Sequence, residues 1–257
     1  MEANVKQNLG LAFFNEITFN KIMKHLFITG ASSGIGKALA EYALSKGDKV
    51  TGISRRHTIN HKNYSHIHMD LSEHSDLGKI NFVPVKEADT AVLVNNAGWL
   101  GDVRPVAEMD PDKIARAFSI NVTAPAILSR MFLGHLKNQG ENLTKVVLNI
   151  SSGVSRYPLS SWSTYCASKA ALDMFTKVLK VDHPEVHAFS VAPGIVDTEM
   201  QGEIRRLTVE HFPDKDRFVE YKEKGELSQP KDVALNLYNV MDQPSDYKEV
   251  CFSLKDM

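Results

Sequence analysis

The sequence has little cysteine, with only Cys166 and Cys251 in 257 residues. Two cysteines are too few for a disulfide framework, and these two do not have the spacing of metal ligands. This composition is typical of a protein from a reducing compartment. We therefore expect a cytoplasmic protein without a metal site.

Charge of one sign and long apolar segments are also missing. The 30 Lys and Arg residues nearly balance the 31 Asp and Glu residues, so the formal net charge is −1, and no long like-charged run occurs. We therefore expect neither nucleic acid nor a membrane as a partner. The apolar stretches are strand-sized, shorter than the ~20 residues of a membrane-spanning helix. The run LGLAFF at 9–14 is too short for a secretory signal.

No linker rich in Pro, Gly or Ser, no repeat and no low-complexity tract divides the chain. We interpret residues 23–257 as one domain, because a chain of this length buries roughly 70–75% of the surface that its unfolded form exposes. Met23 immediately precedes the first strong strand pattern. We interpret residues 1–22 as an N-terminal extension, either a disordered appended arm or a non-native start-site artefact, and leave it out of the fold prediction.

From Met23 onward, strand-like apolar runs alternate with stretches that repeat apolar residues at helical spacing. Strands joined by helices of this length imply right-handed crossovers and a parallel sheet covered on both faces. We predict a single-domain α/β fold, a Rossmann-like doubly wound parallel sheet of about seven strands. The predicted strands lie at 24–30, 48–54, 66–69, 90–96, 145–151, 186–194 and 249–254, and the predicted helices at 35–47, 112–136, 163–182, 199–224 and 231–241.

The first predicted strand leads into a glycine-rich loop, TGASSGIG, before the first helix. Glycines in this place permit a tight turn, the approach of a pyrophosphate to the backbone and close packing of the helix, whose N-terminus attracts anions. The spacing is G-x-x-x-G-x-G instead of G-x-G-x-x-G, and a purely structural turn is the alternative. Because the loop opens a βαβ unit, we predict a dinucleotide site. The residues expected at its phosphates are Gly30, Ser32, Ser33, Gly34, Ile35 and Gly36.

The second predicted strand ends in GISRR, at 52–56. NAD sites place an acidic residue here for the ribose, whereas Arg55 and Arg56 carry guanidinium groups that suit a 2′-phosphate. We therefore predict NADP(H) as the cofactor, with a solvated basic turn as the alternative. Asp70 and Leu71, just past the third strand, are candidates for contact with the adenine, and Asp70 is equally suited to cap a helix.

Tyr165 and Lys169 stand four residues apart in a helical stretch and therefore share one face. An adjacent ammonium favours the phenolate and moves the pKa of a phenol from ~10 toward neutrality, where the group can act as acid and base. A surface pair is the alternative for this common spacing. Ser152, at the end of the fifth strand, can donate to a carbonyl oxygen or cap a loop. Asn121 lies inside a predicted helix, where its amide needs a backbone or water partner.

Two further motifs close predicted strands, NNAG at 95–98 and PGIVDTEM at 193–200. Together with TGASSGIG, Asn121, Ser152 and the Tyr165–Lys169 pair, they occur in an order and spacing that resemble the short-chain dehydrogenase/reductase family over 23–257. Each motif is weak alone, but their common register is specific. The resemblance implies an oxidoreductase that interconverts alcohols and carbonyls with a nicotinamide cofactor.

The resemblance also implies a role for each matched residue. Tyr165 donates its proton to the carbonyl oxygen as hydride arrives, Ser152 polarises that oxygen, and Lys169 binds the nicotinamide ribose and lowers the tyrosine pKa. Asn121 holds a water that relays protons to Lys169. The remaining cofactor contacts implied by the family are Asn96, Ala97 and Gly98 at the ribose, and Pro193, Gly194, Val196 and Thr198 at the carboxamide and phosphates.

Within the family, the stretches SWSTYCASKAALDMF and APGIVDTEMQGEIR most resemble benzil reductases that form (S)-benzoin, with sepiapterin reductases next. Sepiapterin reductases carry an acid in the last strand, where this chain offers Ser253, with Asp256 as a substitute in another register. We predict NADPH-dependent reduction of a small aryl ketone or diketone, with a pterin ketone as the alternative. The predicted walls of an apolar pocket, alternatively core or rim residues, are Trp99, Leu100, Tyr157, Trp162 and Met200.

The family usually forms dimers or tetramers through the helices after the fourth and fifth strands. We therefore expect a homodimer or homotetramer that uses the helices at 112–136 and 163–182. The polar segment 199–224 is a candidate lid over the pocket. A regulator that senses NADPH without catalysing a reaction is the alternative from a different functional class.

Overall fold

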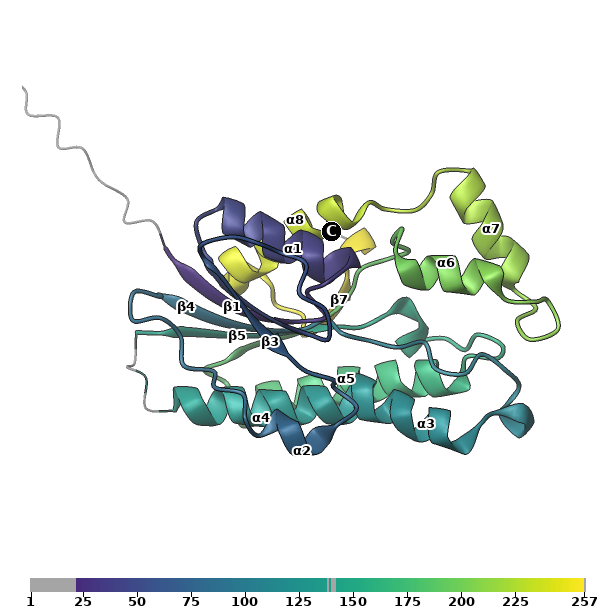
Figure 1. Ribbon diagram of the computed structural model, residues 1–257, viewed down its shortest axis with the longest axis horizontal. Helices are drawn as coiled ribbons and strands as arrows, with labels where there is room; N and C mark the ends of the chain where they lie inside the picture. The colour runs from purple at the N-terminus through teal and green to yellow at the C-terminus, as the bar shows by residue number, and fades with distance from the viewer. Residues whose placement is uncertain (1–21, 138, 140–141, 257) are drawn as a thin grey trace, which may run out of the picture.

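The computed structural model describes residues 22–137, 139 and 142–256 (Figure 1). These residues form one seven-stranded parallel sheet in the order β3-β2-β1-β4-β5-β6-β7. The predicted doubly wound parallel sheet is therefore confirmed, whereas residues 1–21 of the predicted extension lie outside the described residues. The strands are β1 Lys24–Thr29, β2 Lys49–Ser54, β3 Tyr64–His68, β4 Thr90–Asn95, β5 Thr144–Ile150, β6 His187–Ala192 and β7 Cys251–Ser253.

Helices cover both faces of the sheet, as Figure 1 shows. One face carries α1 (Gly34–Ser45) and α8 (Pro230–Asp242), which pack against each other. The opposite face carries α2 (His74–Leu77), α4 (Ala124–Leu136) and α5 (Ser163–Asp182). Because all neighbouring strands are parallel, each connection returns the chain to the amino edge of the sheet before the next strand begins.

The strand β4 shows why the central strands are continuous apolar runs. All six of its residues are buried. Val92 and Val94 join the core beneath α1 and α8, while Ala91 and Leu93 join the core beneath α4. Successive side chains point to opposite faces of a strand, so a strand covered on both faces needs an apolar residue at nearly every position.

The helix predicted at 112–136 is interrupted in the structure. It consists of α3 (Pro111–Phe118), a π-helical turn at Ser119–Thr123, and α4. Pro125 has no N–H to donate to the carbonyl of Asn121, so the regular i to i+4 ladder fails at that point. The π turn therefore falls on Asn121, one of the predicted catalytic residues.

The segment predicted as one helix at 199–224 is two helices, α6 (Glu199–Arg206) and α7 (Lys215–Glu223). Pro213 lies in the connection, where it cannot continue a helix begun before it. Figure 1 shows α6 and α7 extending beyond one edge of the sheet, on the side of α1 and α8. That edge holds the carboxyl ends of the strands. Within the described part of the chain, no helix has the length and apolar character needed to cross a bilayer.

Candidate active site

A cleft of about 880 Å³ opens at the carboxyl edge of the sheet, where ligands bind in folds of this kind. It runs from the glycine-rich loop and the end of β2, past the ends of β4, β5 and β6, to α6 and α7. All the predicted site residues line it except Gly36, Leu100 and Asn121. The sequence motifs, although far apart in the chain, are therefore brought together in one cavity.

The glycine-rich loop has the backbone that a phosphate cradle needs. Gly30 and Gly34 have φ values of +67° and +54°, in the left-handed region that favours glycine. Gly36 does not line the cleft, because it lies against the loop itself. A Cβ atom on Gly36 would come within 2.5 Å of the Gly30 carbonyl oxygen, so glycine is required there for close packing. The residues present thus fit a pyrophosphate at the start of α1.

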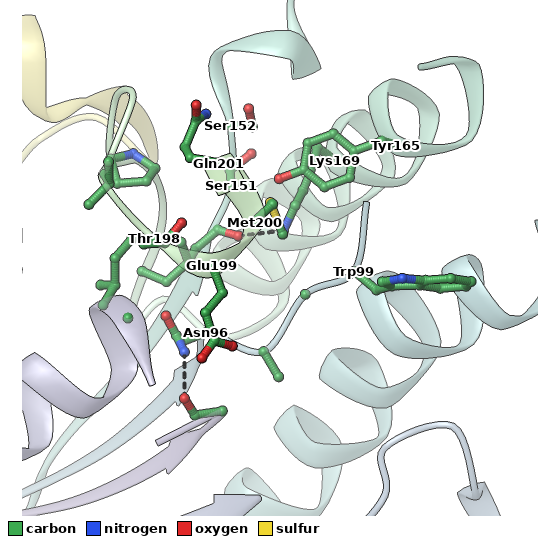
Figure 2. A pocket seen from close by; sticks show the side chains of 18 of the residues that line it. Asn96, Trp99, Ser151, Ser152, Tyr165, Lys169, Thr198, Glu199, Met200 and Gln201 are labelled. Atoms are coloured by element: carbon green, nitrogen blue, oxygen red, sulfur yellow. Dashed lines mark hydrogen bonds between the residues drawn. The ribbon is translucent and has the colours of Figure 1, made fainter. Parts of the chain in front are cut away.

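Asn96 ties the glycine-rich loop to the end of β4. Its Nδ2 donates to the carbonyl oxygen of Thr29 at 2.9 Å, and its backbone N–H donates to Thr29 Oγ1 at 3.0 Å. Figure 2 shows Asn96 in the lower part of the view, on the side of the cleft away from Ser152 and Tyr165. Asn96 therefore fixes the relative position of the two loops, whatever contact it makes with a ribose.

The basic pair after β2 lies at the far end of the cleft from Tyr165. Ser54 Oγ donates to the carbonyl oxygen of Arg56 at 2.8 Å, which holds the turn. Arg56 Nη2 forms an ion pair with Glu199 Oε2 at 3.4 Å, and both side chains are mostly exposed. Glu199, which the sequence analysis did not single out, belongs to the PGIVDTEM motif and lines the cleft. It competes with any phosphate for the same guanidinium.

Asp70 serves as a cap for its own turn. Its Oδ1 accepts hydrogen bonds from Ser72 N at 2.9 Å and Ser72 Oγ at 2.8 Å, and its Oδ2 lies 3.8 Å from Arg116 Nη2. The hydrogen bond from the Ser72 backbone is the largest cause that lowers the pKa of Asp70. The predicted helix cap is therefore wrong, since Asp70 caps a turn and the N-cap residue of α2 is Glu73. Asp70 also lines the cleft together with Leu71, and their contact with the adenine stays a prediction.

Tyr165 and Lys169 occupy the floor of the cleft. Both come from the first two turns of α5 and are almost fully buried, with exposed fractions of 7% and 3%. Lys169 Nζ lies 5.6 Å from the centre of the Tyr165 ring and donates to the carbonyl oxygen of Ile150 at 2.7 Å. The i, i+4 spacing therefore produces a buried pair, and the alternative of an exposed surface pair is wrong.

Burial governs the electrostatics of this pair. It raises the pKa of Tyr165 to about 12, and the Ser152 hydroxyl opposes this effect. Burial also lowers the pKa of Lys169 to about 8, which the carboxylate of Asp173 opposes. The expected lowering of the tyrosine pKa is not found, because loss of solvation is the largest effect on this phenol. The phenol is thus protonated at neutral pH, which is the form a proton donor needs.

Ser152 and Asn121 bond backbone groups near the Tyr165–Lys169 pair. Ser152 Oγ accepts from Val154 N at 3.4 Å, so the hydroxyl caps the turn that follows β5 and also lines the cleft. Asn121 is 1% exposed and lies behind the wall of the cleft. Its Oδ1 accepts from Trp99 N at 2.9 Å and its Nδ2 donates to Trp99 O at 2.8 Å. The amide therefore finds the backbone partner expected of it.

The other end of the cleft is aromatic. Trp162 packs edge-on against Tyr165, with ring centres 5.6 Å apart, and stacks on Phe212 at 5.3 Å. Trp99, Tyr157 and Met200 also line the cleft, whereas Leu100 does not. Leu100 is 5% exposed and packs in the same apolar cluster as Val103 and Ile204, so its prediction as a pocket wall is corrected to a core position.

Several residues of this end were not predicted as site residues. Phe218 and Tyr221 come from α7, and a polar helix pattern gave no sign that it would turn these rings toward the cleft. Ser253 and Asp256, considered only for their register in the last strand, both line the cleft beside Lys255. The remaining unpredicted lining residues with polar side chains are Ser54, Arg116, Ser151, Gln201, Glu203 and Arg217. Nothing in their local sequence pattern distinguishes them.

Comparison with known proteins matches this arrangement to one family. The family model described as short chain dehydrogenase matches residues 24–208. The chain is 33% identical over 234 residues to the benzil reductase ((S)-benzoin forming) of Bacillus subtilis, covering 87% of this chain and 96% of that protein. It is 32% identical over 224 residues to the sepiapterin reductase of Xenopus tropicalis, covering 78% and 84%. The crystal structure of a short chain dehydrogenase/reductase from Saccharomyces cerevisiae superposes with a TM-score of 0.78 at 29% identity, covering 90% and 95%.

Proposed function

Because the chain belongs to the short-chain dehydrogenase family, whose members are oxidoreductases with nicotinamide cofactors, we propose that it reduces a small aryl ketone or diketone with NADPH. The observation that carries the proposal is the buried Tyr165–Lys169 pair on the floor of the cleft. A protonated phenol beside a buried ammonium is suited to donate its proton to a carbonyl oxygen on which negative charge develops. The same cleft continues to the glycine-rich loop and to Arg55 and Arg56.

The residues of the chain supply a proton and fix the geometry, while NADPH supplies the hydride when it is bound. Tyr165 Oη gives its proton to the carbonyl oxygen, and Ser152 Oγ donates a hydrogen bond to that oxygen as negative charge develops. Lys169 carries a positive charge next to the phenol. Because Lys169 is buried, the surrounding dielectric constant is low and this charge interacts strongly with negative charge that develops nearby. The raised pKa of Tyr165 keeps the proton in place until the carbonyl is present.

The choice of NADPH over NADH rests on Arg55 and Arg56, which both line the cleft at the end of β2. A guanidinium binds a phosphate through two parallel hydrogen bonds, and no acidic residue occupies 52–56 to hold the ribose hydroxyls instead. Replacing both arginines by alanine should raise the KM for NADPH by about 10- to 100-fold and leave the KM for NADH within about twofold. Equal KM values of the unaltered protein for both cofactors would overturn the preference.

The substrate class rests on the aromatic end of the cleft and on the benzil reductase relatives. Trp162, Phe218 and Tyr221 provide flat apolar walls for an aryl ketone. A pterin ketone is the second candidate, because the Asp256 carboxylate lines the cleft and sepiapterin reductases are also relatives. A carboxylate can hold the N–H groups of a pterin edge, which benzil lacks.

The first experiment is oxidation of NADPH, followed by its absorbance, with benzil, 1-phenyl-1,2-propanedione, sepiapterin and aliphatic ketones. Rapid turnover of the aryl diketones supports the proposal, and a preference for sepiapterin supports the second candidate. Tyr165→Phe should bind NADPH nearly unchanged and lose turnover about 10³-fold. Tight NADPH binding without turnover of any ketone would instead indicate an NADPH-sensing regulator.

We also propose that the chain forms a homodimer or homotetramer through α4 and α5. The helix α5 exposes Met174, Val178 and Val181, with exposed fractions of 59%, 49% and 78%, on one side of the helix. A second copy of the chain would cover this apolar side. Val178→Asp should shift the molecular mass measured by light scattering toward the monomer.

Both cysteines are free thiols, in keeping with a cytoplasmic protein.

A further inference from the structure

The aromatic end of the cleft contains a buried polar side chain that the proposed chemistry does not use. Gln201 lies in the first turn of α6, is 9% exposed and lines the cleft. Among the described residues, its Oε1 has no hydrogen-bond partner. Figure 2 shows the side chain of Gln201 on the side of the cleft that holds Ser152 and Tyr165, away from Asn96.

Two buried amides near the sheet, Asn121 and Asn149, contrast with Gln201, whereas Asn95 Oδ1, which does not line the cleft, also lacks a hydrogen-bond partner among the described residues. Asn121 bonds the backbone of Trp99 through both its Oδ1 and its Nδ2. Asn149 donates to Thr176 Oγ1 at 2.8 Å and accepts from Asn95 Nδ2 at 2.8 Å. Buried polar atoms are almost always satisfied in native proteins, and an unsatisfied one needs an explanation. The position of Gln201 in the lining of the cleft suggests that its partner is a ligand.

Two more polar atoms in the lining share this property. Ser151 is 4% exposed and Trp162 is 5% exposed, and within the described chain neither Ser151 Oγ nor Trp162 Nε1 has a hydrogen-bond partner. Their neighbours in the lining, Phe218 and Ile204, are apolar. The aromatic end of the cleft therefore combines apolar walls with a few unpaired polar atoms, which is the pattern of a site that orients a ligand.

We propose that Gln201 binds a second oxygen of the substrate, so that the cleft selects ketones with a carbonyl or hydroxyl oxygen next to the carbonyl that is reduced. The first oxygen faces Tyr165 and Ser152. Rotation of the Gln201 amide by 180° exchanges Oε1 and Nε2, so that Nε2 can take the unpaired position and donate a hydrogen bond to the second oxygen. A hydroxyl in the same place can donate to Gln201 Oε1, because an amide is both donor and acceptor. This inference rests on the proposed reductase function and assigns its substrate class, a 1,2-dioxygenated ketone, to one residue.

The test compares two substrates that differ only in the second oxygen. Benzil has two adjacent carbonyls, and deoxybenzoin has the same two phenyl rings with a CH₂ group in place of one carbonyl. We would measure kcat/KM for both with the unaltered protein, with Gln201→Met, which keeps the length of the side chain, and with Gln201→Leu. The ratio of the two kcat/KM values is then compared between each variant and the unaltered protein, because this comparison cancels the greater intrinsic reactivity of the diketone.

The expected result is a loss of about tenfold in kcat/KM for benzil in both variants, with deoxybenzoin changed by less than about twofold. Thermal unfolding of each variant checks that it is folded. A similar loss for both substrates means that Gln201 only shapes the pocket, and no loss for either means that water satisfies its amide. Both outcomes overturn the inference while the reductase function stands. If the unaltered protein binds NADPH but reduces neither ketone, the proposed function fails and the inference fails with it.

Discussion

Two lysines are buried at opposite edges of the same sheet. Lys24 begins β1 at the amino edge, is 2% exposed, and pairs through Nζ with the carboxylate of Asp242. Its Nζ also donates to Tyr238 Oη at 3.3 Å. Lys169 lies at the carboxyl edge, is 3% exposed, and donates to a neutral acceptor, the carbonyl oxygen of Ile150. Within the described residues it forms no ion pair.

The difference separates a structural charge from a functional one. A buried ammonium with a carboxylate partner loses less free energy on leaving water than one without. Burial lowers the pKa of Lys169 to about 8, so the carboxylate of Asp173 offsets only part of the cost of burying the charge. The amino edge of the sheet satisfies its charges within the fold, while the carboxyl edge leaves one available for a bound ligand. Such a charge is maintained at some cost to stability.

Exchanging each lysine for methionine tests this contrast, and the largest effect is expected on activity. Lys169→Met should lower kcat for ketone reduction by about 10³-fold, because it removes the positive charge next to the proton donor Tyr165. Lys24→Met should leave kcat within about twofold, since it lies at the opposite edge of the sheet. Steady-state kinetics of both variants with NADPH and benzil measure the effect. Comparable losses in the two variants would contradict the distinction.

The second largest effect is on stability, and here the loss is expected in Lys24→Met instead of Lys169→Met. Lys24→Met breaks a partly buried ion pair that ties β1 to α8 and should lower the free energy of unfolding by about 2 kcal/mol. Asp242→Asn is the control. It should cost less, because Asp242 is 43% exposed and its place can be taken by water. Urea denaturation at pH 7 compares the three proteins. A loss of less than about 1 kcal/mol for Lys24→Met would show that the pair is dispensable.

Lys169→Met should stabilise the protein below pH 8. The shift of the lysine pKa from 10.5 to about 8 corresponds to a destabilisation of about 3 kcal/mol, which the substitution removes. The substitution also removes the hydrogen bond to Ile150, which stabilises the unaltered protein by about 1 kcal/mol, so the net gain in stability is about 2 kcal/mol. Because the pKa is lower in the folded state, the penalty is fully present below about pH 8. It declines as the pH rises and vanishes near 10.5, where the unfolded lysine also loses its proton.

Urea denaturation of Lys169→Met and the unaltered protein at pH 7, 8, 9 and 10 measures this difference. The two stabilities should converge as the pH rises. The variant Lys24→Met retains Lys169. The difference in stability between this variant and the unaltered protein should therefore not disappear as the pH rises. A difference for Lys169→Met that is constant with pH would mean that the ammonium is not the origin of its effect.

The carboxyl edge could be predicted from the sequence because its residues lie in short motifs. TGASSGIG, NNAG and PGIVDTEM each follow a strand, and the carboxyl ends of parallel strands meet at one edge. The spacing of Tyr165 and Lys169 placed both on one helical face without knowledge of the packing. Local pattern and chain topology were sufficient for these motifs, but not for Gln201, Phe218 and Tyr221, which line the same cleft.

The amino edge could not be predicted in the same way. Lys24, Asp48, Tyr238 and Asp242 form one network, in which Tyr238 Oη donates to Asp48 at 2.6 Å, but they come from three distant parts of the chain. None of these four residues lies in a recognisable sequence motif, so the network forms only when α8 packs against α1 in the folded protein. The sign of the pKa shift of Tyr165 was missed for a related reason, since burial depends on the whole fold.

The smallest effect is expected from the exposed ion pair at the mouth of the cleft. Arg56 and Glu199 are 61% and 69% exposed, so Glu199→Gln should change the free energy of unfolding by less than about 0.5 kcal/mol. It should nevertheless lower the KM for NADPH by about two- to threefold at low salt, because Glu199 no longer competes for the guanidinium, and should leave the KM for NADH unchanged. Glu203→Gln, a carboxylate in the same lining, is the matched control. An equal change for NADH would place the effect of Glu199 elsewhere than at Arg56. At the carboxyl edge, then, even a charge that contributes almost nothing to the fold should be detectable through a ligand.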